Sequence, residues 1–428
     1  MNILIQHGHV IDPANKIDAK MDVYVAAGKI VGVGSAPADF KADQTIDATG
    51  LMVAPGLVDL SARLREPGFE YKATLNSELQ AAAAGGVTSL ACPPDTEPTL
   101  DEPGLVEMLK YRAKKLNLAH VYPLGALTRQ LEGKNLTEMC ELTDAGCVGF
   151  TQADFPIVDT QVLWRAFEYA ATFGYTLFLR AEDYYLAKGG VAHDGEVASR
   201  LGLKGIPAAA ESLALATLLR IARETGTRLH IQRLSTAEGV ALVRQAKLQG
   251  QAVTADVSTQ HLHLTELDIG FFNTLTHLRP PLRTQRDQHA LCDGLKDGTI
   301  DAICSDHSPV DDDAKLLPFA EAEAGASAVE LLLPLALKWA NQHQLSVADA
   351  IARITTVPAN IMGIPAGTLS VNACADIVIF DAEEYWKVEA NRLKSQGKNT
   401  PFLNMELAGK VHYTLVEGLI TYQGHSPN

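Results

Sequence analysis

About eight short apolar segments alternate with helical patterns between residues 55 and 364, and this alternation most restricts the fold. The strand candidates are GLVDLS, VTSLACP, HVYPLGAL, CVGFT, YTLFLRAE, RLHIQRLS, AVTADVS and DAICSDH. The helix candidates include ATLNSELQAAAAGG, DEPGLVEMLKYRAKKLN, DTQVLWRAFEYAATFG, AAAESLALATLLRIARETG and AEGVALVRQAKLQG. Such a repeated strand–helix pattern predicts an α/β fold, the (β/α)8 TIM barrel. In that barrel the functional residues follow the C-terminal ends of the strands.

The two ends of the chain have a different pattern. Residues 1–54 contain short apolar runs such as NILIQHGHVID and DVYVAAGKIVGVG, separated by glycines and Asp-Pro, which predict a small antiparallel β unit. Residues 365–428 show the same pattern in CADIVIFDA and VHYTLVEGLITYQG. Because both β-rich ends flank one core, we expect them to form one composite β-domain, a small β-sandwich, beside a barrel of residues 55–364.

Composition and charge exclude several classes of partner. The chain has 428 residues and a net charge of −15, which disfavours binding to nucleic acid or to an anionic membrane. No apolar run has the length of a membrane span, and MNILIQHGHVID lacks the pattern of a secretory signal. The six cysteines are scattered without a C-x-x-C pair, which indicates free thiols in a reducing compartment. We therefore expect a cytoplasmic protein.

One apolar run, in PGLVDLSARLREPG at residues 55–68, lies between two Pro-Gly pairs, as is typical of a buried strand that leads to a site. With the following FEYKATLNSELQAAAAGGVTSLACPPDT, this segment resembles the dihydroorotases of the amidohydrolase superfamily. So do AED at 181–183, GIPAAAES, TGTRLHIQ, PPLR at 280–283, DGTIDAICSDHSP and KNTPF at 398–402. The resemblance is co-linear over nearly the whole chain. It implies the same barrel and composite β-domain, and a place in pyrimidine biosynthesis.

The resemblance also implies where metal ligands would lie. Active members carry two histidines at the end of the first strand and one histidine at the end of each of two later strands. In this sequence the first pair is replaced by Ser61 and Arg63, and the later two are replaced by Arg180 and Arg233. All four of these positions therefore lack the imidazole that would bind the metal.

Two acidic ligands complete the metal site of the family that this chain resembles. The bridging aspartate comes from a turn that reads GFTQADFP here, so that Gln152 or Ala153 takes its position and Asp154 is shifted by about one residue. The last-strand aspartate is matched by Asp306 in CSDHSP. Asp306 is thus expected to be a remnant, and we predict neither catalytic residues nor a bound metal or other cofactor.

Arginine at three ligand positions changes the electrostatics of the site. A guanidinium stays protonated and offers no lone pair, so three of them repel Zn²⁺. They can pair with Asp306, Glu182 or Asp183 as a salt-bridged plug, or they can bind an anion. We favour the plug.

The expected substrate contacts are also altered. Arg65, in LREPG, matches the arginine that binds the substrate carboxylate in the family, and it is the one candidate substrate-binding residue that remains. Asp95 and Arg279 replace two substrate-binding asparagines, and Val310 replaces a substrate-contacting histidine. An anionic Asp95 would disfavour an anionic substrate.

Three functions of different classes remain open. The first is a non-catalytic dihydroorotase homologue that assembles with the catalytic chain of aspartate carbamoyltransferase, as a homodimer within a larger hetero-oligomer; PPDTEP and the ligand-free first strand resemble that subgroup. The second is an active dihydroorotase or cyclic amidohydrolase with a relocated or single zinc site, for which His261 and His263 would share one face of an extended segment. The third is a sensor whose arginines bind a nucleotide or carboxylate. We favour the first, and expect mobility in the acidic, alanine-rich loop 310–326.

Overall fold

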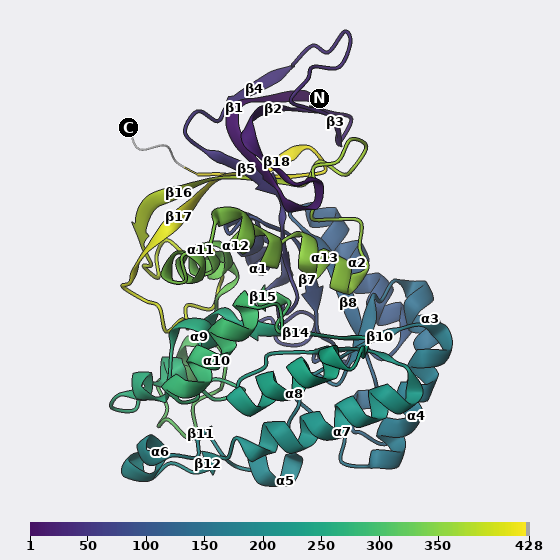
Figure 1. Cartoon of the computed structure of the whole chain (residues 1–428), viewed down its shortest axis with the longest axis vertical. Helices are drawn as coiled ribbons and strands as arrows, with labels where there is room; N and C mark the ends of the chain where they lie inside the picture. The colour runs from purple at the N-terminus through teal and green to yellow at the C-terminus, as the bar shows by residue number, and fades with distance from the viewer. Residues whose placement is uncertain (425–428) are drawn as a thin grey trace.

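Eight parallel strands form a nearly closed barrel in the computed structural model, which describes residues 1–424 (Figure 1). In pairing order the strands are β15 (Ala302–Cys304), β14 (Val253–Ser258), β13 (Arg228–Ile231), β10 (Thr176–Leu179), β9 (Gly149–Thr151), β8 (His120–Ala126), β7 (Val87–Cys92) and β6 (Leu57–Asp59). Each strand lies within one of the eight predicted segments. The prediction of a TIM barrel is therefore confirmed.

The first and last barrel strands meet through the residues that follow them. Ala62 and His307 form an isolated parallel bridge. The Arg63 amide donates to the His307 carbonyl at 2.9 Å, and the His307 amide donates to the Ser61 carbonyl at 3.0 Å. The barrel thus closes at its C-terminal end, next to two of the expected site positions.

Helices surround the strands and bury the apolar side chains between them. The main barrel helices are α1 (Leu75–Ala84), α2 (Pro103–Leu116), α3 (Met139–Ala145), α4 (Thr160–Phe173), α7 (Ala209–Thr225), α8 (Ala237–Leu248), α10 (Gln285–Lys296) and α11 (Leu332–Gln342). Shorter elements are α5 (Tyr184–Ala187), α6 (Glu196–Leu201), α9 (Thr259–His263), α12 (Val347–Arg353), α13 (Thr356–Met362), β11 (Ala192–His193) and β12 (Gly205–Ile206). Within residues 1–424, no helix combines the length and apolar character that crossing a membrane requires.

Strands from both ends of the chain form one mixed sheet, as expected (Figure 1). Its order is β18 (Leu419–Gln423), β17 (Glu406–Val416), β16 (Ile377–Lys387), β5 (Met52–Pro55), β1 (Asn2–Asp12), β2 (Ile17–Ala26) and β3 (Lys29–Val33), while β4 (Gln44–Asp47) pairs with β1. The expectation of a purely antiparallel unit at the N-terminus is wrong, because β1 pairs in parallel with β4 and β5. The connection of residues 34–43 lets the chain return in the direction of β1. The exact domain boundaries stay a prediction.

The mixed sheet packs against the end of the barrel where the strands begin. Gly86, just before β7, has a positive φ of 80°, and a Cβ there would lie 2.6 Å from the Val378 side chain. Gly56, just before β6, donates its amide to the Asp376 carbonyl at 2.8 Å. A Cβ at Gly56 would lie 2.1 Å from Thr88 Oγ1, so both positions need glycine. The other end of the barrel, here called the barrel mouth, carries the residues after the strands.

Candidate functional site at the barrel mouth

Arg63 follows β6 and lies among side chains from three other strand ends. Its Nε donates to Asp95 Oδ2 at 2.7 Å, and its Nη2 donates to Asp154 Oδ2 at 2.7 Å. Its Nη1 donates to Ser308 Oγ at 2.9 Å and lies 3.6 Å from Asp306 Oδ1. All three nitrogens of this buried guanidinium therefore have partners.

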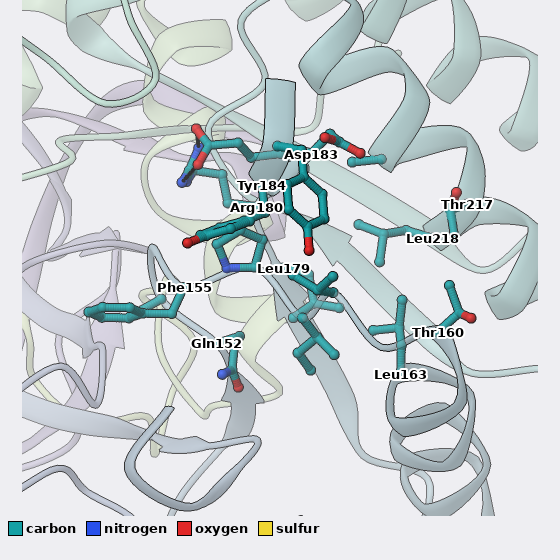
Figure 2. Close-up of a pocket in the computed structure, with 17 residues that line it drawn as sticks. Gln152, Phe155, Thr160, Leu163, Leu179, Arg180, Asp183, Tyr184, Thr217 and Leu218 are labelled. Carbon is teal, nitrogen blue, oxygen red and sulfur yellow. Dashed lines mark hydrogen bonds and ion pairs between the residues drawn. The ribbon is translucent and has the colours of Figure 1, made fainter. Parts of the chain in front are cut away.

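Arg180, labelled in Figure 2, follows β10 and pairs with the carboxylates of Asp154 and Glu182. Its Nε donates to Asp154 Oδ1 at 2.8 Å. Its Nη1 and Nη2 donate to the two oxygens of Glu182 at 2.7 and 2.9 Å, which is the bidentate geometry that suits a guanidinium. Arg279 Nη2 reaches the same Glu182 carboxylate at 2.5 Å.

Arg233 follows β13 and joins the same network. Its Nη2 donates to Asp154 Oδ1 at 2.7 Å, and its Nη1 donates to Asp306 Oδ1 at 3.0 Å. The backbone at Arg233 has a positive φ of 54°, and its amide donates to Asp256 Oδ1 at 2.7 Å. This anchored turn directs the side chain into the barrel mouth, although its buried Nε has no partner.

Asp154 is the centre of the network, because it accepts from Arg63, Arg180 and Arg233. Ala153 before it has a positive φ of 49°, so the chain turns sharply after β9. Gln152 points elsewhere and donates to Thr128 Oγ1 and to a backbone carbonyl, each at 2.8 Å. From the sequence, Asp154 is expected about one residue away from the position of the bridging aspartate. The arginines at neighbouring strand ends were the signal that a shared carboxylate was needed.

Charge is balanced across the mouth. Four guanidiniums meet four carboxylates in the ion pairs of this network: Arg63, Arg180, Arg233 and Arg279 with Asp95, Asp154, Glu182 and Asp306. Burial would raise the pKa of Asp154, but the guanidiniums outweigh it and hold that pKa well below its usual value. Burial likewise opposes ionisation of Glu182, whose pKa the paired arginines nevertheless lower to about 2. At Asp306 burial prevails and raises the pKa, despite Arg233 and Arg63.

The remaining predicted site residues do not form an open pocket. The Ser61 backbone takes part in barrel closure, and its side chain is buried. Arg65 Nε donates to the Pro309 carbonyl at 2.8 Å, and its Nη2 lies 3.8 Å from Glu323 of the loop 310–326. Val310 is also buried. The residue that resembles a substrate-binding arginine is thus held against the loop that follows the last strand.

A cavity of about 250 Å³ lies beside the network, between α4, α5 and α7 (Figure 2). Arg180 and Glu182 form its polar wall, and Phe155, Leu163 and Leu218 belong to its apolar wall. A small molecule in this cavity would meet a guanidinium–carboxylate pair.

The two histidines considered for a relocated metal do not share a face. They lie on α9, which Ser258 caps, and helical residues two positions apart point in different directions. His261 Nδ1 is 2.7 Å from Ser258 Oγ and its Nε2 is 3.2 Å from the Pro281 carbonyl. His263 Nε2 is 2.9 Å from the Leu335 carbonyl. Burial lowers both pKa values to about 4, so neutral imidazoles are favoured at the buried His261 and the partly buried His263.

Comparisons with known proteins agree with this architecture. The Dihydro-orotase-like family matches residues 50–239, and the Amidohydrolase family matches residues 189–422. A dihydroorotase-like protein from Pseudomonas aeruginosa is 46% identical over 430 residues, with 99% of this chain and 100% of the relative covered. The chain belongs to the dihydroorotase-like proteins of the amidohydrolase superfamily.

Another relative and two solved structures also match this dihydroorotase-like protein over nearly its full length. A dihydroorotase from Syntrophus aciditrophicus is 40% identical over 427 residues, covering 99% of this chain and 100% of the relative. Among solved structures, L-hydantoinase from Arthrobacter aurescens superposes with a TM-score of 0.87 at 26% identity, covering 98% of this chain and 95% of the hydantoinase. Dihydropyrimidinase from Brevibacillus agri shares the fold, with a TM-score of 0.82 at 21% identity and the same coverage.

The residues at the mouth of this dihydroorotase-like protein do not fit the metal centre that the resemblance implies. A divalent cation needs lone pairs from imidazole, thiolate or carboxylate groups. Here three ligand positions are guanidiniums, and the remaining carboxylates are paired with them. His307, which directly follows Asp306 in the sequence, is buried, and its Nε2 lies 2.6 Å from Glu78 Oε2. Within residues 1–424, the one group of three close metal-ligating side chains lies at the other end of the barrel.

Proposed function

We propose that this dihydroorotase-like protein is a non-catalytic subunit in pyrimidine biosynthesis that assembles with the catalytic chain of aspartate carbamoyltransferase. The observation that carries the proposal is the shared Asp154 carboxylate, which three arginines reach at 2.7–2.8 Å where a metal centre would be needed. A hydrolase of this superfamily generates its nucleophile on a metal. The arginines supply charge there but no lone pairs, so they cannot generate that nucleophile.

An anion sensor is less well supported than a structural role. Every nitrogen of Arg63 and Arg180 already donates to a protein oxygen. The carboxylates balance the guanidinium charge, so an incoming anion would have to replace buried ion pairs. The network therefore favours a mouth closed by its own ion pairs over a site that binds an anion.

The proposed partner rests on the resemblance to degenerate dihydroorotase homologues that support aspartate carbamoyltransferase. Two dihydroorotase-like proteins, from Pseudomonas aeruginosa and Pseudomonas putida, are 46% and 44% identical to this chain over nearly their full lengths. We propose that this chain supports aspartate carbamoyltransferase in the cytoplasm, as a homodimer inside a larger hetero-oligomer.

An activity assay tests the absence of catalysis. Purified protein is supplied with Zn²⁺ and assayed for cyclisation of carbamoyl aspartate and for the reverse reaction. We expect no turnover above the buffer rate. Turnover that requires Zn²⁺ and disappears in Asp306→Ala would contradict the proposal, because it would show a working metal centre at the mouth.

Co-expression tests the partnership. The chain is produced with the aspartate carbamoyltransferase of the same organism and sized by light scattering. We expect one large hetero-oligomer and a loss of transcarbamoylase activity or assembly when this chain is omitted. Two separate peaks, with full transcarbamoylase activity in the partner alone, would refute the structural role. An exposed-charge variant, Glu132→Gln, serves as a control for expression and handling.

A further inference from the structure

Three metal-ligating side chains meet at the end of the barrel opposite the mouth. His120 is the first residue of β8, and Cys374 and Asp376 lie in the extended segment before β16. Residues two positions apart in an extended chain face the same side, so both point toward the histidine. One donor atom from each of the three lies within 4.8 Å of the others. We call this group the seam site, because it joins the barrel to the mixed sheet.

Two of the three separations at the seam site match those of neighbouring ligands around one ion, and the donor atoms of His120 and Cys374 lie within 4.8 Å of each other. His120 Nε2 is 3.3 Å from Asp376 Oδ1 and 3.1 Å from Oδ2. Cys374 Sγ is 3.4 Å from Asp376 Oδ1. Metal bonds of about 2.0–2.3 Å in a tetrahedral site put neighbouring donor atoms about 3.3–3.7 Å apart. An ion bound to all three donors would need the His120 and Cys374 donor atoms at a similar separation.

The backbone holds the two ligands of the extended segment in place. The Ala375 amide donates to the Gly28 carbonyl at 2.9 Å, and the Asp376 carbonyl accepts from Gly56 at 2.8 Å. The Glu417 amide donates to Asp376 Oδ1 at 2.9 Å, which orients the carboxylate. Such outer contacts fix ligand geometry before a metal arrives.

No lysine or arginine of residues 1–424 forms an ion pair with Asp376 of the seam site. Among residues 1–424, His120 is the one side chain that forms an ion pair with Asp376. Burial would lower the pKa of His120, but Asp376 and Glu417 raise it overall. Burial, Asp376 and Glu417 together raise the pKa of the Cys374 thiol to about 12.

A cavity reaches one of the three ligands, His120. It has a volume of about 360 Å³, and Glu417 and the α2 residues Lys110 and Lys114 also line it. It is large enough for a hydrated ion to reach the imidazole and for water to fill a remaining coordination position.

We propose that His120 Nε2, Cys374 Sγ and Asp376 bind one divalent transition-metal ion of the zinc type, with water from the cavity as the fourth ligand. On binding, the Cys374 thiol releases its proton to solvent and its sulfur forms a bond to the ion, without a change of oxidation state. Nitrogen, sulfur and carboxylate donors suit zinc. The ion links β8 of the barrel to the segment before β16. The site is separate from the mouth and independent of the proposed function.

Metal titration tests the seam site. Full-length protein is stripped with a chelator, kept reduced with a phosphine, and titrated with Zn²⁺ or Co²⁺ alone. We expect one ion per chain and, with Co²⁺, a thiolate-to-metal charge-transfer band. His120→Gln and Cys374→Ser should each weaken binding on the order of 100-fold or more. Cys140→Ser changes another half-buried free thiol and should bind normally. Unchanged stoichiometric binding in the His120→Gln/Cys374→Ser double variant would overturn the proposal.

A second measurement needs no variant and covers the case in which the substitutions prevent folding. Zn²⁺ should slow alkylation of Cys374 in the native protein, at least 10-fold, and leave the rate at Cys140 unchanged. Equal rates at Cys374 with and without Zn²⁺ would refute the site. Bound zinc without turnover leaves the proposed non-catalytic function intact, whereas turnover lost in Asp306→Ala contradicts that function alone.

Discussion

The two ends of the barrel differ in how their polar side chains are paired. At the mouth, buried guanidiniums stand at the expected ligand positions and are neutralised by carboxylates from neighbouring strand ends. At the seam site, an imidazole, a thiol and a carboxylate converge without a lysine or arginine partner among residues 1–424. The difference teaches that metal binding depends on side chains with free donor atoms. A residue at an expected ligand position does not bind a metal if its side chain has no lone pair to offer.

The largest effect should come from removing the carboxylate that the mouth shares. Asp154→Ala leaves three buried arginines without their common partner. Because breaking a buried ion pair leaves an uncompensated charge, we expect a loss of about 3–5 kcal/mol in the free energy of unfolding. Urea denaturation measures it, with the exposed Glu132→Gln as a control expected to change stability by less than about 0.5 kcal/mol. Equal stability of both variants would show that the network is not a structural plug.

Restoring two of the expected histidines should destabilise the ion-pair network at the mouth without creating a metal site. Ser61→His/Arg63→His removes the guanidinium that pairs with Asp95 and Asp154, and we expect a loss of about 3 kcal/mol by urea denaturation. Arg180 and Arg233 still exclude a cation, so no zinc-dependent cyclisation of carbamoyl aspartate should appear. Measurable zinc-dependent turnover would contradict this expectation, because it would show that the mouth can hold a catalytic metal.

Acid should weaken the mouth through Glu182. Its pKa is lowered from 4.5 to about 2 in the folded protein, so the stability it contributes is full above pH 4.5 and is lost as the pH falls toward 2. A shift of this size corresponds to about 3 kcal/mol. The difference in unfolding free energy between the wild type and Glu182→Gln should stay constant from pH 7 to about pH 5 and then shrink. A difference that does not change below pH 4.5 would argue against the Arg180–Glu182 pair.

The smallest effect is expected at the rim of the network. Arg279 pairs with Glu182, but its side chain is 43% exposed and Arg180 already holds the same carboxylate. Solvent screens such a pair, so Arg279→Ala should cost about 1 kcal/mol or less. Thermal denaturation at low and high salt would measure it. A loss as large as that of Asp154→Ala would show that the network extends to the protein surface.

Much of the fold was predictable from the sequence because the barrel strands are short apolar runs between helical patterns. The charged positions Arg63, Arg180 and Arg233 were also identified at strand ends. The central role of Asp154 was not, because it depends on the left-handed turn at Ala153, and sequence spacing does not report backbone conformation.

Long-range geometry explains the other differences. The parallel pairing of β1 with β4 and β5 depends on where two connections return the chain, which local patterns do not specify. The segment with His261 looked extended from its alternation, yet Ser258 caps a short helix there. The seam site was hidden because His120 and Cys374 are far apart in the sequence and meet through the packing of the mixed sheet on the barrel.

The closure of the barrel beside Arg63 also sets an order of events during synthesis. Ala62 pairs with His307, and Arg63 donates to Ser308, a residue 245 positions later. At about 5–20 residues per second, the ribosome reaches Ser308 roughly 12–50 s after Arg63. Until then this guanidinium has only Asp95 and Asp154 for neutralisation. The barrel can therefore close beside Arg63 only after its last strand has been made.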